Sequence, residues 1–175
     1  MKAVEINKTG GPEVLGLKDI KLSDPKSGEV LINQKAIGLN YIDTYHRSGL
    51  YPVPLPSGIG LEGAGIIEKV GPDTDGFKEG DKVTYAAAPI GSYASHRIYP
   101  IKNLIKVPDE IDLEIIAAIM TKGLTTFYLL HKTYEAKSVK QYYSTLRLEE
   151  WDKFFVNGPK VLDVQLLVQL DQMKK

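Results

Sequence analysis

The residues best suited to chemistry lie in one stretch, residues 38–52, where polar and aromatic side chains follow a segment with strand-like composition. The Asn40 amide both donates and accepts hydrogen bonds, so it is suited to binding a carboxamide. Tyr45 and Tyr51 add ring faces and hydroxyl groups. Polar groups at the end of a strand on a rigid scaffold are typical of a binding site. In the alternative interpretation, Asn40 and Asp43 satisfy the backbone of a turn while the tyrosines pack, and residue types alone favour this alternative.

Composition excludes several other kinds of site. The chain has no cysteine, which removes disulfides, thiolate ligands and thiol nucleophiles. His46, His96 and His131 are far apart and show no ligand spacing, so we interpret them as surface or locally bonded side chains. The 22 basic and 22 acidic residues balance, which argues against a nucleic-acid or membrane partner. No apolar signal stretch or membrane-spanning run occurs, and we expect a cytoplasmic protein.

The elements that would position these residues are mostly β-strands. Segments with strand-like composition lie between turns rich in Gly, Pro, Asp and Ser, at residues 2–6, 29–37, 64–70, 82–85, 93–99 and 104–107. Many short strands separated by such turns predict a closed or partly open β-barrel. The expected fold class is therefore mainly β, of the α+β type, with helices after the barrel.

Two helices are expected after the barrel. Asp112 is placed to cap the first helix. A second helical repeat is formed by Leu124, Phe127, Tyr128 and His131. The predicted junction between the two helices lies at residues 121–123.

Five motifs occur in order along the first 136 residues. They are Gly-Gly-Pro-Glu-Val-Leu at 10–15, the stretch 38–52, Gly-Leu-Glu-Gly-Ala-Gly at 60–65, Lys-Glu-Gly-Asp-Lys-Val at 78–83 and Lys-Gly-Leu-Thr at 122–125. Each motif is weak alone, but the ordered set resembles the zeta-crystallin-like quinone oxidoreductases of the medium-chain dehydrogenase/reductase superfamily. The resemblance implies a GroES-like substrate domain over residues 1–136. It also implies a following Rossmann domain and hydride transfer from NADPH to quinones or other small electrophiles.

The resemblance also assigns roles to individual residues. The implied cofactor-binding residues are Asn40, Tyr41, Ile42, Asp43, Thr125 and Tyr128, and the implied substrate-binding residues are Tyr45 and Tyr51. Their role would be orientation and stacking, so no side chain is expected to act as a catalytic nucleophile. Without the resemblance, Thr125 reads as an early-helix polar residue and Tyr128 as a core aromatic.

The same comparison of motifs bears on metal binding. Zinc-dependent relatives place a Cys and a His as ligands in two of these motifs. Asn40 and Leu61 stand at those positions here, and neither binds zinc well, because a tetrahedral zinc site needs thiolate or imidazole ligands. We therefore expect a zinc-independent family and no bound metal.

Residues 137–175 differ from everything before them. Gly and Ala almost vanish, and residues 161–173 form a dense run of Val, Leu, Gln and Asp. A dinucleotide site requires a strand, a Gly-rich turn and a helix N-terminus. The family carries an Ala-rich Gly-Gly-Val-Gly turn near this point, but residues 143–152 share none of it. We therefore expect that this chain lacks the cofactor domain and does not bind NADPH alone.

The genetic code offers an explanation. When the third base of each codon is joined to the first two bases of the next, residues 144–153 can encode His-Ala-Ala-Ala-Gly-Gly-Val-Gly-Gln. The glycine read across Trp151 and Asp152 is obligatory, because tryptophan has a single codon, which ends in G. We interpret residues 137–175 as a shifted-frame remnant of the cofactor domain that ends at an early stop. The alternative is a genuine helical tail that serves oligomerisation.

Three functional hypotheses remain open at this point. The chain is a truncated reductase, inactive alone; or it is a module that binds a small aromatic ligand without redox chemistry; or it is an interaction protein. In the third case it would self-associate or pair with a full-length relative, and apolar groups around Phe127 and Tyr128 would supply an exposed patch. Whether the chain itself is an enzyme is left undecided by the sequence.

Overall fold

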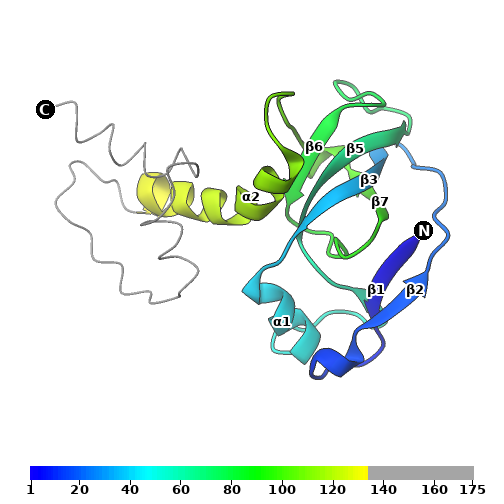
Figure 1. Cartoon of the computed structure of the whole chain (residues 1–175), viewed down its shortest axis with the longest axis vertical. Coiled ribbons are helices and arrows are strands. Elements are labelled where there is room, and N and C mark those ends of the chain that lie inside the picture. Colours follow the sequence, from blue (N-terminus) through cyan, green and yellow to red (C-terminus); the bar gives the residue numbers. More distant parts are fainter. Residues whose placement is uncertain (134–175) are drawn as a thin grey trace, which may run out of the picture. The chain divides into compact units, whose positions relative to one another are not determined.

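The computed structural model describes residues 1–133, which fall into two compact units, Met1–Thr121 and the described part of Lys122–Lys175. The first unit contains two antiparallel sheets (Figure 1). The smaller has the strand order β2-β1-β4, from Gly16–Asp19, Lys2–Ile6 and Ser57–Gly58. The larger has the order β7-β3-β5-β6-β8, from His96–Pro100, Glu29–Gly38, Glu62–Val70, Lys82–Ala86 and Ile105–Lys106.

The two sheets stay open and do not close into a barrel. Strand β3 pairs with β7 from Glu29 to Asn33, and the segment before β7 then turns away toward β1. There Val4 N–H donates to the Tyr93 carbonyl at 2.7 Å, and Ala3 forms an isolated bridge with Ala94. Of the closed and partly open forms that the sequence predicts, the structure therefore adopts an open one.

The core of the first unit lies on the inner face of the larger sheet. It is formed by the buried side chains Val30, Ile32, Ile67, Val83, Tyr85, Tyr99 and Leu104. β-Branched residues dominate it, as expected for side chains packed on a pleated surface. A second buried cluster, Ala64, Val107, Leu113 and Ala117, packs the start of helix α2 (Leu113–Tyr128) against the sheet.

The core also contains a buried arginine packed on two tyrosine rings. Tyr85 and Tyr99 stack with ring centroids 4.3 Å apart, and the buried Arg97 guanidinium lies over both rings. Burial raises the pKa of Tyr99 to about 12 and also raises the pKa of Tyr85, so both phenols remain hydrogen-bond donors at neutral pH. The Tyr85 hydroxyl donates to Gln34 Oε1, which connects the core to the middle of β3.

The polar stretch after β3, where the sequence predicts no helix, begins one. Helix α1 spans Tyr41–Ser48, with Asn40 as its N-cap and Gly49 as its C-cap. Gly49 has a φ of 86°, a left-handed conformation that favours glycine, and its N–H donates to the Tyr45 carbonyl at 3.1 Å. Three-residue 3-10 helices occur at Pro12–Val14 and Ile101–Asn103.

The predicted break at residues 121–123 is wrong. A single helix, α2, spans Leu113–Tyr128 and is followed by a π-helical turn, Leu129–Thr133. Gly123 is accommodated within α2 because a helical glycine costs only about 1 kcal/mol relative to alanine. The predicted N-cap is confirmed, since Asp112 Oδ1 accepts from the Glu114 N–H at 2.7 Å.

The predicted strands are otherwise confirmed to within a few residues, except that β7 begins at His96 and not at residue 93. Strands β2 and β4 were not predicted. None of the helices within residues 1–133 has the length and apolar character needed to cross a bilayer. The tail at 137–175, including the run at 161–173, lies outside the described residues.

Candidate functional site

The first candidate residues are positioned where β3 passes into α1. Strand β3 ends at Gly38, and Asn40 begins the helix in an extended conformation. The Asp43 carboxylate accepts a hydrogen bond from the Asn40 backbone N–H at 3.0 Å, the reciprocal half of a capping box. The Tyr93 hydroxyl donates to the same carboxylate oxygen at 3.0 Å. The start of α1 is therefore fixed to the sheet by side-chain hydrogen bonds.

The Asn40 side chain is held by a fully buried carboxylate. Its Nδ2 donates to Glu62 Oε2 at 2.5 Å, while Glu62 Oε1 accepts the backbone N–H of Thr121 at 2.7 Å. A buried carboxylate is tolerated only when hydrogen bonds replace its lost hydration, and Glu62 receives one at each oxygen. Because an ionised carboxylate only accepts, this contact fixes which end of the Asn40 amide faces Glu62.

Gly38 makes the approach of Glu62 possible. A Cβ atom added there would lie 2.4 Å from Glu62 Oε2 and 2.4 Å from the Ala117 carbonyl oxygen. Real Cβ atoms do not come this close to neighbouring atoms, so any other residue would push α2 or the carboxylate away. Strand β3, strand β5 and helix α2 therefore meet at a position that only glycine fits.

Three tyrosines form one aromatic cluster on and after α1. The ring centroids of Tyr41 and Tyr45 lie 5.3 Å apart with an edge-on geometry, and those of Tyr45 and Tyr51 lie 5.2 Å apart. Tyr51 is anchored to the helix by its backbone N–H, which donates to the Tyr45 carbonyl at 3.1 Å. Tyr41 and Tyr51 are 67% and 49% exposed, so the cluster offers aromatic faces to a ligand. The structure thus brings the two predicted substrate residues together.

Burial and hydrogen bonding act in opposite directions on Asp43. The side chain is 3% exposed, and this desolvation raises its pKa above the ordinary value of 3.8. Hydrogen bonds from Asn40 and Tyr93 and the charge of His46 oppose the rise without cancelling it. Within the described residues, Asp43 Oδ1 and His46 Nδ1 are buried without a hydrogen-bond partner. The carboxylate at the base of α1 is therefore incompletely satisfied.

The remaining predicted cofactor residues are placed differently. Ile42 is partly buried on α1. Thr125 and Tyr128 lie in the second half of α2, which belongs to the second compact unit. Tyr128 is 57% exposed there, in contrast to the core aromatic that its spacing also allows. The assignment of these residues to a cofactor remains a prediction.

The histidines lie apart in the structure as well. His46 is buried on α1, whereas His96 on β7 has its Nε2 3.3 Å from a Glu68 carboxylate oxygen. The side chain of His131 is outside what the structure describes. No cluster of three or more His, Asp or Glu side chains suited to a metal occurs among the described residues.

Sequence reasoning missed three side chains that organise this region: Glu62, Tyr93 and Gln34. Glu62 and Tyr93 bind the first turn of α1, and Gln34 bonds to the segment before β7. A signal existed only for Glu62, which is a charged residue within the run Gly-Leu-Glu-Gly-Ala-Gly. The small residues that follow this carboxylate, Gly63, Ala64 and Gly65, indicate a crowded, buried strand. Nothing local marked the other two.

Comparison with known proteins agrees with this architecture. Residues 26–109 match the alcohol dehydrogenase GroES-like domain family. The quinone oxidoreductase of Pseudomonas aeruginosa is 43% identical over 175 residues, which cover 99% of this chain and 54% of that protein. A 2-haloacrylate reductase from a Burkholderia species is 41% identical over 142 residues, covering 77% of this chain and 42% of that protein.

A solved structure gives the same picture. Escherichia coli quinone oxidoreductase complexed with NADPH superimposes with a TM-score of 0.76 and 47% identity, over 77% of this chain and 42% of that one. This chain spans about half the length of the relatives that it matches. Its open antiparallel sheets and capped α1 define it as a GroES-like domain of the alcohol dehydrogenase type. The chain is thus similar to part of the quinone oxidoreductases, in agreement with the medium-chain dehydrogenase/reductase superfamily that its motifs resemble.

The hydrogen bond between Asn40 and Glu62 can be tested by exchanging the donor and acceptor groups at the two positions. Glu62→Gln turns one acceptor oxygen into a donor, which leaves two donors facing each other, so the free energy of unfolding should fall by about 1–3 kcal/mol. The double variant Asn40→Asp with Glu62→Gln restores one donor and one acceptor and should recover part of the loss. Urea denaturation of the wild type, both single variants and the double variant measures the coupling. If the double variant is no more stable than the single variants, the contact does not carry this stability.

The raised pKa of Asp43 predicts a pH dependence of stability. When the pKa of an acid is higher in the folded than in the unfolded state, its contribution to stability is fully present below the unfolded pKa, ordinarily 3.8. That contribution is lost as the pH rises through the raised folded value. Asp43→Asn cannot titrate, so the wild-type stability minus the variant stability should fall as the pH rises above about 3.8 and then level off. Urea unfolding at a series of pH values measures this difference, and a difference that grows with pH would contradict the assignment.

Proposed function

We propose that this GroES-like domain provides the substrate side of a quinone reductase and binds its substrate against the α1 tyrosines. The observation that carries the proposal is the exposed cluster of Tyr41, Tyr45 and Tyr51 directly after the fixed Asn40. Flat conjugated rings pack well on tyrosine faces, and the hydroxyls can donate to carbonyl oxygens. Tyr45 and Tyr51 would flank the substrate and hold it in a reactive orientation.

The names of the relatives narrow the substrate class. A quinone and a 2-haloacrylate both contain a carbon–carbon double bond conjugated to a carbonyl group, and relatives named for each are more than 40% identical to this chain. The substrate proposed here is therefore an electrophilic alkene conjugated to a carbonyl, with quinones as the leading case. Asn40 and Leu61 stand where zinc-dependent relatives place ligands, so the domain would work without zinc.

We propose that the described residues contact only the nicotinamide end of NADPH. By the resemblance, Asn40, Tyr41, Ile42 and Asp43 would border the nicotinamide, and Thr125 and Tyr128 would also contact the cofactor. A bound NADPH would supply a hydride, and these residues would orient the two reactants. Both sheets within residues 1–133 are antiparallel, and none of their turns joins a parallel strand to a helix in the way that holds a pyrophosphate. We therefore propose that this chain alone neither binds NADPH nor reduces quinones.

Residues 137–175 are proposed to be a shifted-frame reading of the cofactor domain. The support is the hidden Gly-Gly-Val-Gly turn that the codons of residues 144–153 can encode. Sequencing the gene from codon 137 onward is the direct test. Shifting the frame should restore the turn and a complete cofactor domain downstream. If the shifted frame meets stop codons or encodes no Gly-rich turn, the tail is a genuine C-terminal segment and the proposal is wrong.

A second candidate function is a binding module without redox chemistry. It is favoured by the position of the tyrosine cluster and of Asn40, all of which lie in the unit Met1–Thr121 with its own core. Such a domain can hold its site in shape without any contribution from residues 137–175. Pairing with a full-length relative is a third candidate, for which Phe127 and Tyr128, 52% and 57% exposed, offer apolar area.

Quinone binding and turnover by the full chain separate these candidates. Menadione should bind saturably, and Tyr51→Ala should weaken binding by about three- to tenfold through loss of a stacking face. Tyr51→Phe is the matched control, because it keeps the ring and should bind nearly as well. Titration followed by tyrosine fluorescence quenching or calorimetry measures both affinities.

Addition of NADPH completes the experiment. We expect no quinone-dependent oxidation of NADPH and no change in menadione affinity, a combination that supports a substrate domain unable to hold the dinucleotide. Quinone-dependent oxidation that disappears in Asn40→Ala would instead make this chain an active reductase. No saturable menadione binding, with the fold intact by circular dichroism, would contradict the assignment of the tyrosine cluster.

A further inference from the structure

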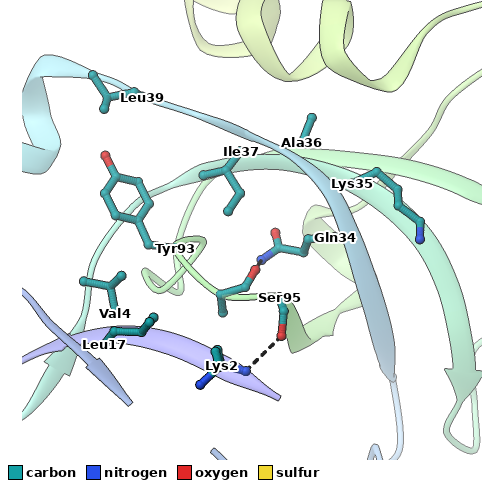
Figure 2. Close-up of a pocket in the computed structure, with 11 residues that line it drawn as sticks. Lys2, Val4, Leu17, Gln34, Lys35, Ala36, Ile37, Leu39, Tyr93 and Ser95 are labelled. Atoms are coloured by element: carbon teal, nitrogen blue, oxygen red, sulfur yellow. Dashed lines mark hydrogen bonds between the residues drawn. The ribbon is translucent and has the colours of Figure 1, made fainter. Parts of the chain in front are cut away.

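A groove separate from the tyrosine cluster opens on the first unit, between the two sheets (Figure 2). Its volume is about 510 Å³, within the range of about 300–1,000 Å³ that is usual for small-molecule sites. Val4 and Leu17 lie on one side of it and Ile37 and Leu39 on the other. The lining residues all belong to Met1–Thr121.

The groove exists because β3 loses its neighbour. The Gln34 backbone N–H still donates to the Ser95 carbonyl at 2.9 Å, but within residues 1–133 no further backbone pairing follows on this side of β3, since the residues before Ser95 bond to β1. The side chain of Gln34 bridges the resulting gap, with Nε2 donating to the carbonyls of Ser92 and Ala94 at 2.8 and 2.6 Å. Residues 35–39 therefore diverge from β1 and leave a space between them.

The side chains of Gln34 and Tyr93 at the bottom of this space are already hydrogen-bonded. Both ends of the Gln34 amide are occupied, because its Oε1 accepts from the Tyr85 hydroxyl. Tyr93 turns its ring to the groove while its hydroxyl donates to Asp43. A ligand here meets apolar side chains and a floor with few free donors, which favours an apolar body.

The charged side chains at the rim of the groove determine which polar group a ligand should carry. Lys2 and Lys35 line the groove, and none of its lining residues is acidic. Lys2 pairs with Asp19 at 3.1 Å, whereas Lys35 makes no ion pair within residues 1–133. A lysine without an ion pair among the lining residues of an apolar groove favours a ligand with a negative charge at one end.

We propose that this groove is a second small-molecule site, which takes a compact aromatic or aliphatic carboxylate. The hydrocarbon part lies between Leu17 and Ile37, and the carboxylate meets Lys35 at the rim. The proposal is independent of quinone binding, because no tyrosine of the α1 cluster lines the groove.

The test uses the full chain with 2-naphthoate as the probe and 2-naphthalenemethanol as its uncharged counterpart. In ¹⁵N-labelled protein, naphthoate should shift the backbone amide signals of Ala36, Ile37 and Ala94, and it should bind more tightly than the alcohol. Lys35→Gln should weaken naphthoate binding about three- to fivefold and leave the alcohol unchanged, as expected for one exposed charge pair. Lys102→Gln, an exposed lysine that does not line the groove, is the matched control and should have no effect.

A second variant tests the apolar wall without disturbing the core. Leu17 is 67% exposed, so Leu17→Glu should fold normally while it places a negative charge beside the site. It should reduce naphthoate binding by about tenfold or more, through lost apolar contact and repulsion. Equal affinity for the acid and the alcohol, unchanged binding in both variants, or shifts confined to residues 41–51 would each overturn the proposal.

Discussion

The buried Glu62 carboxylate is the interaction on which the rest of the site depends. It lies inside strand β5, receives the Asn40 amide at one oxygen and accepts the Thr121 N–H at the other. A carboxylate without hydration is stable only while both bonds are made, so the start of α1 and the middle of α2 must keep their positions relative to β5. Packing alone would hold these elements less specifically, because apolar contacts tolerate small shifts and a pair of directional hydrogen bonds does not.

Two consequences of this constraint reach the proposed substrate site. Asn40 both donates a hydrogen bond to Glu62 and is the N-cap of α1, so the direction of the helix is fixed where it begins. The first turn is further held by Asp43, whose bond from Tyr93 ties it to the segment before β7. The polar side of α1 is therefore used to anchor the helix. Its tyrosines are left to face solvent, which is the arrangement that a stacking site requires.

The sequence predicted the elements that are defined by their own residues, and it missed those that depend on contacts with distant residues. Strands such as β1 and β3 were predicted because apolar residues and turn residues define them without distant contacts. Helix α1 was missed although its signals were present, with Asn40 and Asp43 in capping-box spacing and Gly49 at the end. An eight-residue helix rich in Tyr and Thr has weak propensity, and it is the bonds to Glu62 and Tyr93 that stabilise it. Strands β2 and β4 are short and depend on pairing with β1, which no local pattern reveals.

The same distinction explains why Gln34 and Tyr93 could not be found in advance. Each serves two regions that are distant in sequence: Gln34 links the core tyrosine to the carbonyls of Ser92 and Ala94, and Tyr93 links the groove to Asp43. Because the polar atoms of Gln34 and Tyr93 form hydrogen bonds within the protein, these residues expose mainly amide and ring surface to the groove. An open sheet normally leaves unpaired backbone groups at its gap, and such a gap fills with water or with another strand. Here the Gln34 side chain donates hydrogen bonds to two of those carbonyls, so the gap can remain an apolar groove. In the proposed site, selectivity among ligands therefore depends on the lysines at the rim.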